Sequence, residues 1–173
     1  MYLPSDDSIL LSVSVSGYAG ESALEIGAGS GIILKALHEN FKIVVGTDID
    51  IVSLRHCKDN LPKDIYLACC DAAAPFRYKF DLIVSNPPYL PIEDDEKKDS
   101  AIHGDSGGIE TTLHFIQSAA SVLAKNGKML IVVSSFSDST KIDELIARMK
   151  LKRRSISEKK LFFETLTTLE IGF

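Results

Sequence analysis

Several features are scarce in this 173-residue sequence, and each absence argues against a class of protein. No apolar run reaches the roughly 20 residues that a helix needs to cross a bilayer, so the sequence predicts no membrane segment. The first residues lack the basic and apolar regions of a signal peptide, and we therefore expect a cytoplasmic protein. Positive charge is limited as well: 19 Lys and Arg against 24 Asp and Glu give a net charge of −5, which argues against broad binding to a nucleic-acid backbone.

Residues that bind metals are also sparse. The protein has three cysteines, Cys57, Cys69 and Cys70, without a C-x-x-C pair, and its four histidines have no metal-like spacing. Cys69 and Cys70 are neighbours in a predicted strand and point to opposite faces, which prevents an easy disulfide between them. We therefore expect buried free thiols and no bound metal.

What the sequence does contain is an alternation of apolar strands and helices. Strand-like runs end in a polar or Gly-rich segment, and most are followed by a helical pattern. The predicted strands are 22–26, 42–47, 65–70, 80–85 and 129–133. The predicted helices are one from Asp6 or Asp7 with Ile9, Leu10 and Val13 on its apolar face, then 33–41, 51–60, 109–123 and 138–150, with Asn126-Gly127 ending the fourth.

The last part of the sequence departs from this alternation. Residues 151–157 and 161–171 are predicted strands with only residues 158–160 between them, which leaves no room for a crossover helix. The whole pattern predicts an α/β fold, a Rossmann-like and mostly parallel sheet of seven strands that ends in an antiparallel hairpin. We expect one domain, residues 1–173, in which 1–20 form a lid segment and helix and the acidic residues 90–107 a substrate loop.

The most informative stretch directly follows the apolar strand 80–85 and consists of Asn86, Pro87, Pro88 and Tyr89. Two prolines end the strand and remove two backbone donors, so the amide carbonyl of the Asn86 side group and the backbone carbonyl of Pro87 remain as two acceptors. Such a pair suits a planar NH2 group, because both N–H bonds are accepted while Tyr89 packs on the plane. The end of a strand and the start of a loop would explain these four residues equally well. Only a second motif favours a binding site.

That second motif is the glycine turn 27–31, which follows the first strand. In a doubly wound sheet the ligand crevice lies outside the carboxyl ends of the strands where strand order reverses, here between strands one and four, so the turn and Asn86 should meet. Ile32 stands where a dinucleotide fingerprint has a small residue, which argues against a bound pyrophosphate. Asp48, after strand two, is placed to accept hydrogen bonds from ribose hydroxyls. Asp71, after strand three, is placed to accept one from an adenine amino group. Either carboxylate alone is also explained as a strand-end or capping residue.

Together these residues resemble the class I S-adenosylmethionine-dependent methyltransferases of the NPPY type. The similarity is closest to the HemK-like glutamine methyltransferases of translation release factors, in their short archaeal and eukaryotic branch, and it covers nearly the whole sequence. It is carried by residues 25–31, Asp48, Asp71 and residues 86–89, with further similarity at 2–8, 107–110 and 161–166. Residues 100–105 and Thr111 depart from the family pattern, which bears on substrate fit rather than on the cofactor.

The resemblance implies S-adenosyl-L-methionine as the cofactor and N5-methylation of the glutamine in the GGQ motif of a release factor as the reaction. Catalysis and substrate binding would belong to Asn86, Pro87, Pro88 and Tyr89. The implied cofactor-binding residues are Tyr2, Pro4, Ser8, Glu25, Gly27, Gly29, Gly31, Asp48, Ile49, Asp71, Ala72 and Asn86.

Other acceptors stay open at this point. Adenine N6, guanine N2 and cytosine N4 are planar amino groups that the same two acceptors would hold, and related short enzymes suggest lysine as a further class. A cofactor-binding subunit without activity is the non-enzymatic alternative, against which the intact NPPY motif argues. The acidic composition argues against a nucleic-acid partner, and only the basic residues within 150–160 favour one.

The resemblance also implies a partner, because the short branch works with a small zinc-binding activator subunit. Strand 65–70 should lie at the edge of the sheet, and an apolar edge strand favours pairing with a strand of another protein. We therefore expect a heterodimer formed through this edge, and a release factor as the protein substrate.

Overall fold

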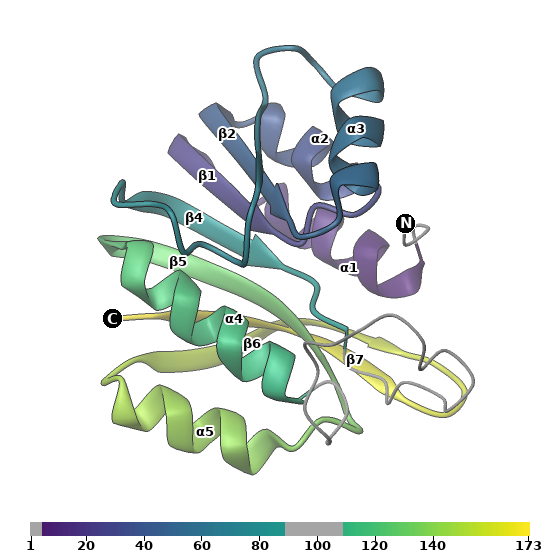
Figure 1. Cartoon of the computed structure of the whole chain (residues 1–173). Helices are drawn as coiled ribbons and strands as arrows, with labels where there is room; N and C mark the ends of the chain where they lie inside the picture. Colours follow the sequence, from purple (N-terminus) through teal and green to yellow (C-terminus); the bar gives the residue numbers. More distant parts are fainter. Residues whose placement is uncertain (1–4, 89–108) are drawn as a thin grey trace.

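The computed structural model of the protein describes residues 5–88 and 109–173, which form one twisted sheet with helices on both faces (Figure 1). The strands are β1 (Gly20–Ile26), β2 (Phe41–Asp48), β3 (Tyr66–Cys69), β4 (Phe80–Ser85), β5 (Leu123–Ser134), β6 (Lys152–Lys160) and β7 (Thr165–Gly172). The helices are α1 (Asp6–Val15), α2 (Ile32–His38), α3 (Ile51–Asn60), α4 (Ile109–Val122) and α5 (Ser139–Arg148).

The order of strands across the sheet is β3-β2-β1-β4-β5-β7-β6. The first five strands pair in parallel, whereas β7 is antiparallel to both β5 and β6. This arrangement confirms the predicted fold class: a Rossmann-like, mostly parallel seven-stranded sheet with an antiparallel hairpin at its end. It also confirms that β1 and β4 are neighbours at the point where strand order reverses.

Each face of the sheet has its own helices and its own apolar core. Helices α1, α2 and α3 cover one face, and α4 and α5 cover the other (Figure 1). The central strand β4 supplies both cores in the alternation that a strand requires: Leu82 and Val84 pack with the first group of helices and Ile83 with the second. Within the two described ranges, no helix combines the length and apolar character needed to cross a membrane.

Two predicted elements agree with the structure at both ends, α3 and β4. Asp50 caps α3 by accepting hydrogen bonds from the backbone N–H groups of Val52 and Ser53. Asp138 caps α5 in the same way. Local sequence signals are strong at these places because the cap satisfies backbone donors that have no partner within the helix.

The predicted apolar face of the first helix is wrong. Helix α1 buries Asp7, Ser8, Leu11 and Val15, whereas Val13 is 66% exposed. The prediction followed hydrophobicity alone, but the polar Asp7 and Ser8 are hydrogen-bonded beneath the helix and determine which face turns inward. The residue at the N-cap position is Ser5 rather than Asp6 or Asp7.

Two predicted helix ends are also corrected. Helix α4 ends at Val122 and β5 begins at the next residue, so Asn126-Gly127 lie inside a strand. The register between β4 and β5 slips between Phe80 and Leu82, and the backbones approach so closely there that a Cβ on Gly127 would lie 2.8 Å from the carbonyl O of Phe80. Phe41, expected near the end of α2, is the first residue of β2.

The last turn and two of the three cysteines differ from expectation as well. Pairing of β6 with β7 continues to Lys160 and Thr165, so residues 158–160 belong to the strand and the turn is 161–164. The three cysteines are free as expected, but Cys57 alone is buried: Cys69 is exposed and Cys70 is half-buried, because they lie at the end of β3, an edge strand with only one neighbour.

Candidate functional site

The glycine turn after β1 has a backbone shape that requires its glycines. Gly27, Gly29 and Gly31 have φ angles of +81°, +49° and +81°, a region that residues with a Cβ avoid. The backbone N–H of Gly27 donates to the carbonyl O of Thr47 at 2.8 Å, which ties the turn to β2. At Gly31 a Cβ would lie 2.8 Å from Cδ1 of Leu61, so the Leu61 side chain would have to shift in addition to the strain of the φ angle.

Asp48, at the end of β2, closes this turn from the side. Its Oδ2 accepts the backbone N–H of Gly29 at 2.9 Å, and its Oδ1 accepts the backbone N–H of Asp50 at 2.9 Å. Each oxygen keeps a further lone pair for a ligand. The Cys57 thiol donates to the carbonyl O of Gly29 at 3.6 Å, and burial, with the carboxylates of Glu25 and Asp48, raises its pKa to about 11.

Glu25, in β1, is buried with only 1% of its surface exposed. Burial raises the pKa of its carboxyl well above the usual range; a hydrogen bond from the backbone of Leu34 opposes this, and the Asp48 carboxylate adds to it. Its Oε2 has no hydrogen-bond partner among the described residues. A buried acceptor without a partner costs about 1–3 kcal/mol, and it marks a place where a ligand can donate a hydrogen bond.

Asn86 lies beside the glycine turn, as predicted, because β4 pairs with β1 up to Ser85 and Ile26. Its Nδ2 donates to the Ser8 hydroxyl at 3.4 Å. Its Oδ1 is buried and has no partner within the part of the protein that the structure describes. Pro87 is buried and Pro88 is exposed.

Ser8 comes from α1, and its own environment sets the direction of this hydrogen bond. Asp7 Oδ1 accepts the Ser8 hydroxyl at 3.2 Å, and both residues are almost fully buried. Because a carboxylate only accepts, the Ser8 proton points to Asp7 and the Ser8 Oγ is left to accept from Asn86. Asn86 must therefore present its NH2 group to Ser8 and turn its carbonyl oxygen to the other side.

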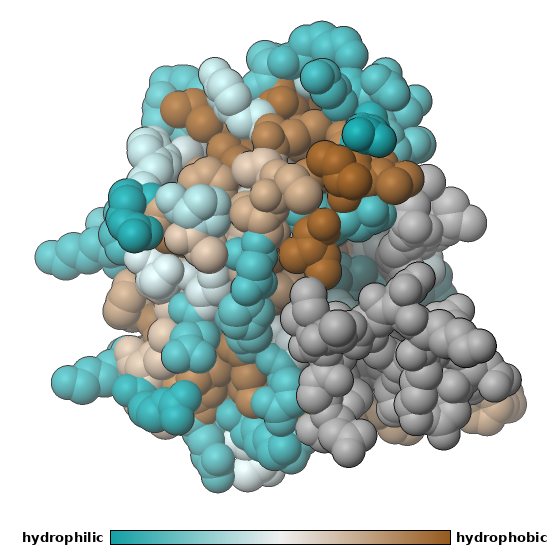
Figure 2. Space-filling model, in the orientation of Figure 1, coloured by the Kyte–Doolittle hydropathy of each residue, from teal (hydrophilic) through white to brown (hydrophobic). Residues whose placement is uncertain are grey.

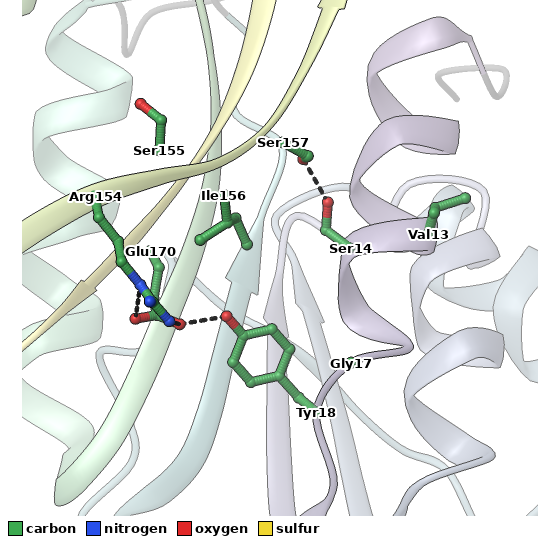
Figure 3. A pocket seen from close by; sticks show the side chains of 9 residues that line it. All are labelled: Val13, Ser14, Gly17, Tyr18, Arg154, Ser155, Ile156, Ser157 and Glu170. Atoms are coloured by element: carbon green, nitrogen blue, oxygen red, sulfur yellow. Dashed lines mark hydrogen bonds and ion pairs between the residues drawn. The ribbon is translucent and has the colours of Figure 1, made fainter.

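The opposite end of α1 is anchored to the last two strands around an open pocket of about 600 Å³ (Figure 3). Tyr18 donates a hydrogen bond to Glu170, and Arg154 donates two to the same carboxylate, at 2.8 and 3.0 Å. Burial and the Glu170 carboxylate raise the pKa of Tyr18 to about 12, while Arg154 lowers the pKa of Glu170. Ser14 and Ser157 share a hydrogen bond of 2.7 Å, so α1 is held at both ends.

Asp71 is engaged by a residue that the sequence did not predict. Its Oδ1 lies 2.8 Å from Nε2 of His114 in α4, and its carboxylate group is 64% exposed. One helical turn later, Ser118 accepts the backbone N–H of Ala73 at 3.0 Å, and between them Ala72 is buried with φ of 45°. Helix α4 thus holds the loop after β3. The spacing of four residues between His114 and Ser118 is the one sequence signal for this contact.

The structure brings most of the predicted cofactor-binding residues to one edge of the sheet, at the carboxyl ends of β1, β2 and β4. These residues are Ser8, Glu25, Gly27, Gly29, Gly31, Asp48, Ile49 and Asn86. Tyr2, Pro4, Tyr89 and the predicted loop 90–107 lie outside the described residues. Across residues 5–88 and 109–173, no three His, Cys, Asp or Glu residues gather as metal ligands.

A second feature lies at the β3 edge of the sheet, which is an outer edge as predicted. Tyr66 and Tyr78 are 63% and 49% exposed, beside an apolar groove of about 350 Å³. The groove is lined by Ile43, Val45, Tyr66, Leu67, Ala68, Phe76, Tyr78 and Phe80. Figure 2 shows apolar residues gathered in the upper part of the visible face, over the half of the sheet that contains β1 and β2.

Comparison with known proteins relates these features to relatives. The family described as methyltransferase small domain matches residues 7–162. A putative protein N5-glutamine methyltransferase of Methanocaldococcus jannaschii is 31% identical over 177 residues, which represent 98% of this sequence and 90% of that protein. A release factor glutamine methyltransferase of Bradyrhizobium diazoefficiens is 33% identical over 124 residues, which represent 62% of this sequence but only 41% of that longer protein.

A solved structure shares the fold over the whole length. It is the E. cuniculi Mtq2–Trm112 complex, described as responsible for methylation of the translation termination factor eRF1. The TM-score is 0.72 at 22% identity, and the match extends over 99% of the present protein and 97% of its counterpart. The matching family and the archaeal relative agree with the glycine turn beside Asn86: this protein belongs to the methyltransferase small domain family.

Proposed function

We propose that the protein is an S-adenosylmethionine-dependent N-methyltransferase whose acceptor is the amide group of the glutamine in the GGQ motif of a translation release factor. One observation carries the proposal: a buried amide oxygen, Asn86 Oδ1, has no partner among the described residues and lies next to the glycine turn. The relatives that are named for glutamine methylation support the choice of acceptor.

The residues present fit this cofactor. A Cβ placed on Gly27 or Gly29 would meet nothing closer than 3.7 Å, so a ligand can approach the backbone of the turn. Glu25 Oε2 offers a buried acceptor for the ammonium group of the methionine part, and Asp48 has lone pairs left for the ribose hydroxyls. Asp71, Ala72 and Ile49 are proposed to border the adenine ring. When bound, S-adenosylmethionine supplies an electrophilic methyl group on a sulfonium sulfur.

In the proposed reaction the protein orients a weak nucleophile. The nitrogen of a glutamine amide reacts poorly because its lone pair is conjugated with the carbonyl. Asn86 Oδ1 and the backbone carbonyl of Pro87 accept its two N–H bonds, which raises electron density on the nitrogen and turns it toward the methyl group. Tyr89 is proposed to pack on the amide plane. The nitrogen then loses a proton to water, so the mechanism requires no strong general base.

Asp7 and Ser8 are proposed to position Asn86 for this role. An asparagine amide can rotate and exchange its oxygen and nitrogen, and only one of the two orientations accepts from the substrate. The hydrogen bonds from Ser8 to Asp7 and from Asn86 to Ser8 select the orientation with the oxygen free. Ser8 thus acts through Asn86, and its role differs from the direct cofactor contact that the resemblance implies.

We also propose that a small activator subunit binds at the β3 edge and that this subunit binds zinc. The edge strand presents unpaired backbone groups beside the apolar groove, a combination that suits addition of a strand from another protein. The related Mtq2 is found in complex with Trm112. Replacing the exposed Tyr66 by Lys should prevent copurification of the activator, whereas replacing the exposed Val52 of α3 by Lys should leave the complex intact.

The proposed reaction is tested by incubating the protein and its activator with methyl-labelled cofactor and three separate acceptors: a release factor, ribosomal RNA and histone. Label should enter the release factor alone, and a release factor with alanine in place of the GGQ glutamine should stay unlabelled. Label in RNA or histone would assign a different acceptor, and no label in any acceptor would contradict enzymatic activity toward all three.

A further inference from the structure

Three exposed phenylalanines lie on the same edge of the sheet as the candidate site. Phe162 and Phe163, in the β6–β7 turn, are 92% and 82% exposed, and Phe136, in the β5–α5 loop, is 65% exposed. We call these three residues the aromatic rim. The rings of Phe162 and Phe163 pack edge to face with centroids 4.6 Å apart, so they form one apolar surface.

Strand pairing places the rim beside the acceptor side of the site. Strand β4 pairs with β5 up to Ser85 and Ile131, and β5 pairs with β7 at Ser134 and Leu166. Asn86, Phe136 and the β6–β7 turn therefore follow strand ends at a common edge. Figure 1 shows the end of β4 and the β6–β7 turn on the same side of the molecule, with the C-terminus on the opposite side.

Hydrogen bonds hold the two loops that carry the aromatic rim. The backbone N–H of Leu161 donates to the carbonyl O of Glu164 at 2.8 Å and closes the β6–β7 turn. The Ser134 hydroxyl donates to the Glu164 carboxylate at 2.5 Å, and the backbone N–H of Ser135 donates to the carbonyl O of Thr165 at 2.9 Å. The two loops that bear the phenylalanines are thus joined to each other, which lowers the entropy lost when a partner binds.

The charges near the rim favour a protein over a nucleic acid. Strand β6 is rich in Lys and Arg, and three of its five cations are paired with carboxylates of the protein. Arg153 pairs with Asp143, Arg154 pairs with Glu170, and Lys159 pairs with Asp6. Binding to a phosphate backbone needs unpaired cations, whereas exposed aromatic residues beside paired charges are typical of protein interfaces.

We propose that the aromatic rim is the docking surface for the protein that presents the glutamine, which makes it a determinant of substrate affinity away from the reacting atoms. This inference rests on the proposed function. It explains why large apolar residues remain exposed on the site edge of an otherwise charged hairpin. A docked partner would bury Phe162 and Phe163 and hold its GGQ loop over Asn86.

The test is a Phe162→Ser/Phe163→Ser variant assayed with intact release factor and with a short peptide that carries the GGQ sequence. The KM for release factor should rise by about tenfold or more, and the ratio of release-factor to peptide kcat/KM should fall by the same factor. Phe173→Ser is the matched control, because Phe173 is 58% exposed at the opposite edge and should leave that ratio unchanged.

A binding measurement separates docking from chemistry. With Asn86→Ala, release factor should still bind, and adding the two serine substitutions should weaken that binding by about tenfold or more. An unchanged KM in the double variant, or an equal rise in KM with Phe173→Ser, would contradict docking at the aromatic rim. Either result would leave the methyltransferase proposal intact. Release factor that the unmodified protein binds but does not methylate would contradict the proposed function instead. Loss of RNA binding rather than of release-factor binding in the double variant would also overturn the rim as a protein-docking surface.

Discussion

On the β1–β2 side of the candidate site most polar groups are bonded to one another, whereas on the β4 side the buried Oδ1 of Asn86 is left open. Asp48 accepts two backbone N–H groups and holds Gly29 in place before any ligand arrives. Asn86 Oδ1 has no partner among the described residues, although one is needed to offset its burial. The comparison teaches that hydrogen bonds within the protein preform the glycine turn, whereas each side keeps one buried oxygen, Glu25 Oε2 or Asn86 Oδ1, that a ligand can engage.

Removing the open oxygen is expected to have the largest effect. Asn86→Ala should lower kcat by on the order of 10² or more, because one positioned polar group at the reacting atom is lost. Cofactor affinity, measured by calorimetry, should stay near that of the unmodified protein. Full turnover in this variant would exclude Asn86 from the reaction.

Disturbing the preformed side should act on stability instead. Gly31→Ala introduces a Cβ at φ of +81° that would lie 2.8 Å from Leu61 and 3.1 Å from the Cys57 sulfur. The strain should lower the free energy of unfolding by about 1–3 kcal/mol in chemical denaturation. Gly17→Ala is the control, because a Cβ there would meet only the carbonyl O of Ser14 at 3.8 Å, and it should change stability by a few tenths of a kcal/mol.

The hydrogen bond between Ser8 of α1 and Asn86 can be tested with a double-mutant cycle. Ser8→Ala should lower kcat by about tenfold with cofactor affinity unchanged, because Asn86 is then free to rotate. Ser8→Thr should restore activity, since it returns the hydroxyl. In the Asn86→Ala background, Ser8→Ala should have no further effect on kcat. Additive losses in the double variant would show that Ser8 acts independently of Asn86.

The last prediction concerns the pH dependence of stability and Glu25, whose Oε2 is the one open acceptor on the β1–β2 side among the described residues. Its pKa is raised in the folded protein, so between the usual pKa and the raised one the folded state binds more protons than the unfolded state, and stability declines as pH rises. Glu25→Gln cannot ionise and should remove up to about 1.4 kcal/mol per pH unit of this decline. Denaturation curves from about pH 5 to pH 8 that keep the same slope in both proteins would contradict a buried, protonated Glu25.

Sequence patterns predicted the parts of the site that depend on local signals. The glycine turn, Asp48 and Asn86 each follow an apolar strand, and a parallel sheet brings such ends together. Contacts between distant segments were missed: Ser8 reaches Asn86 across 78 residues, and His114 reaches Asp71 across 43. The hydrophobic periodicity of a sequence does not indicate hydrogen bonds between side chains of distant segments. The face of α1 was mispredicted for the same reason, because hydrogen bonds to other elements decide its orientation.

The anchoring of α1 has a consequence for how the molecule is made. Asp6, Ser14 and Tyr18 are bound to Lys159, Ser157 and Glu170, so α1 docks on strands that lie 143 to 153 residues further along the sequence. Ser8, which we propose to orient Asn86, lies on this helix, so docking of α1 on the folded β6–β7 hairpin is expected to precede methyl transfer.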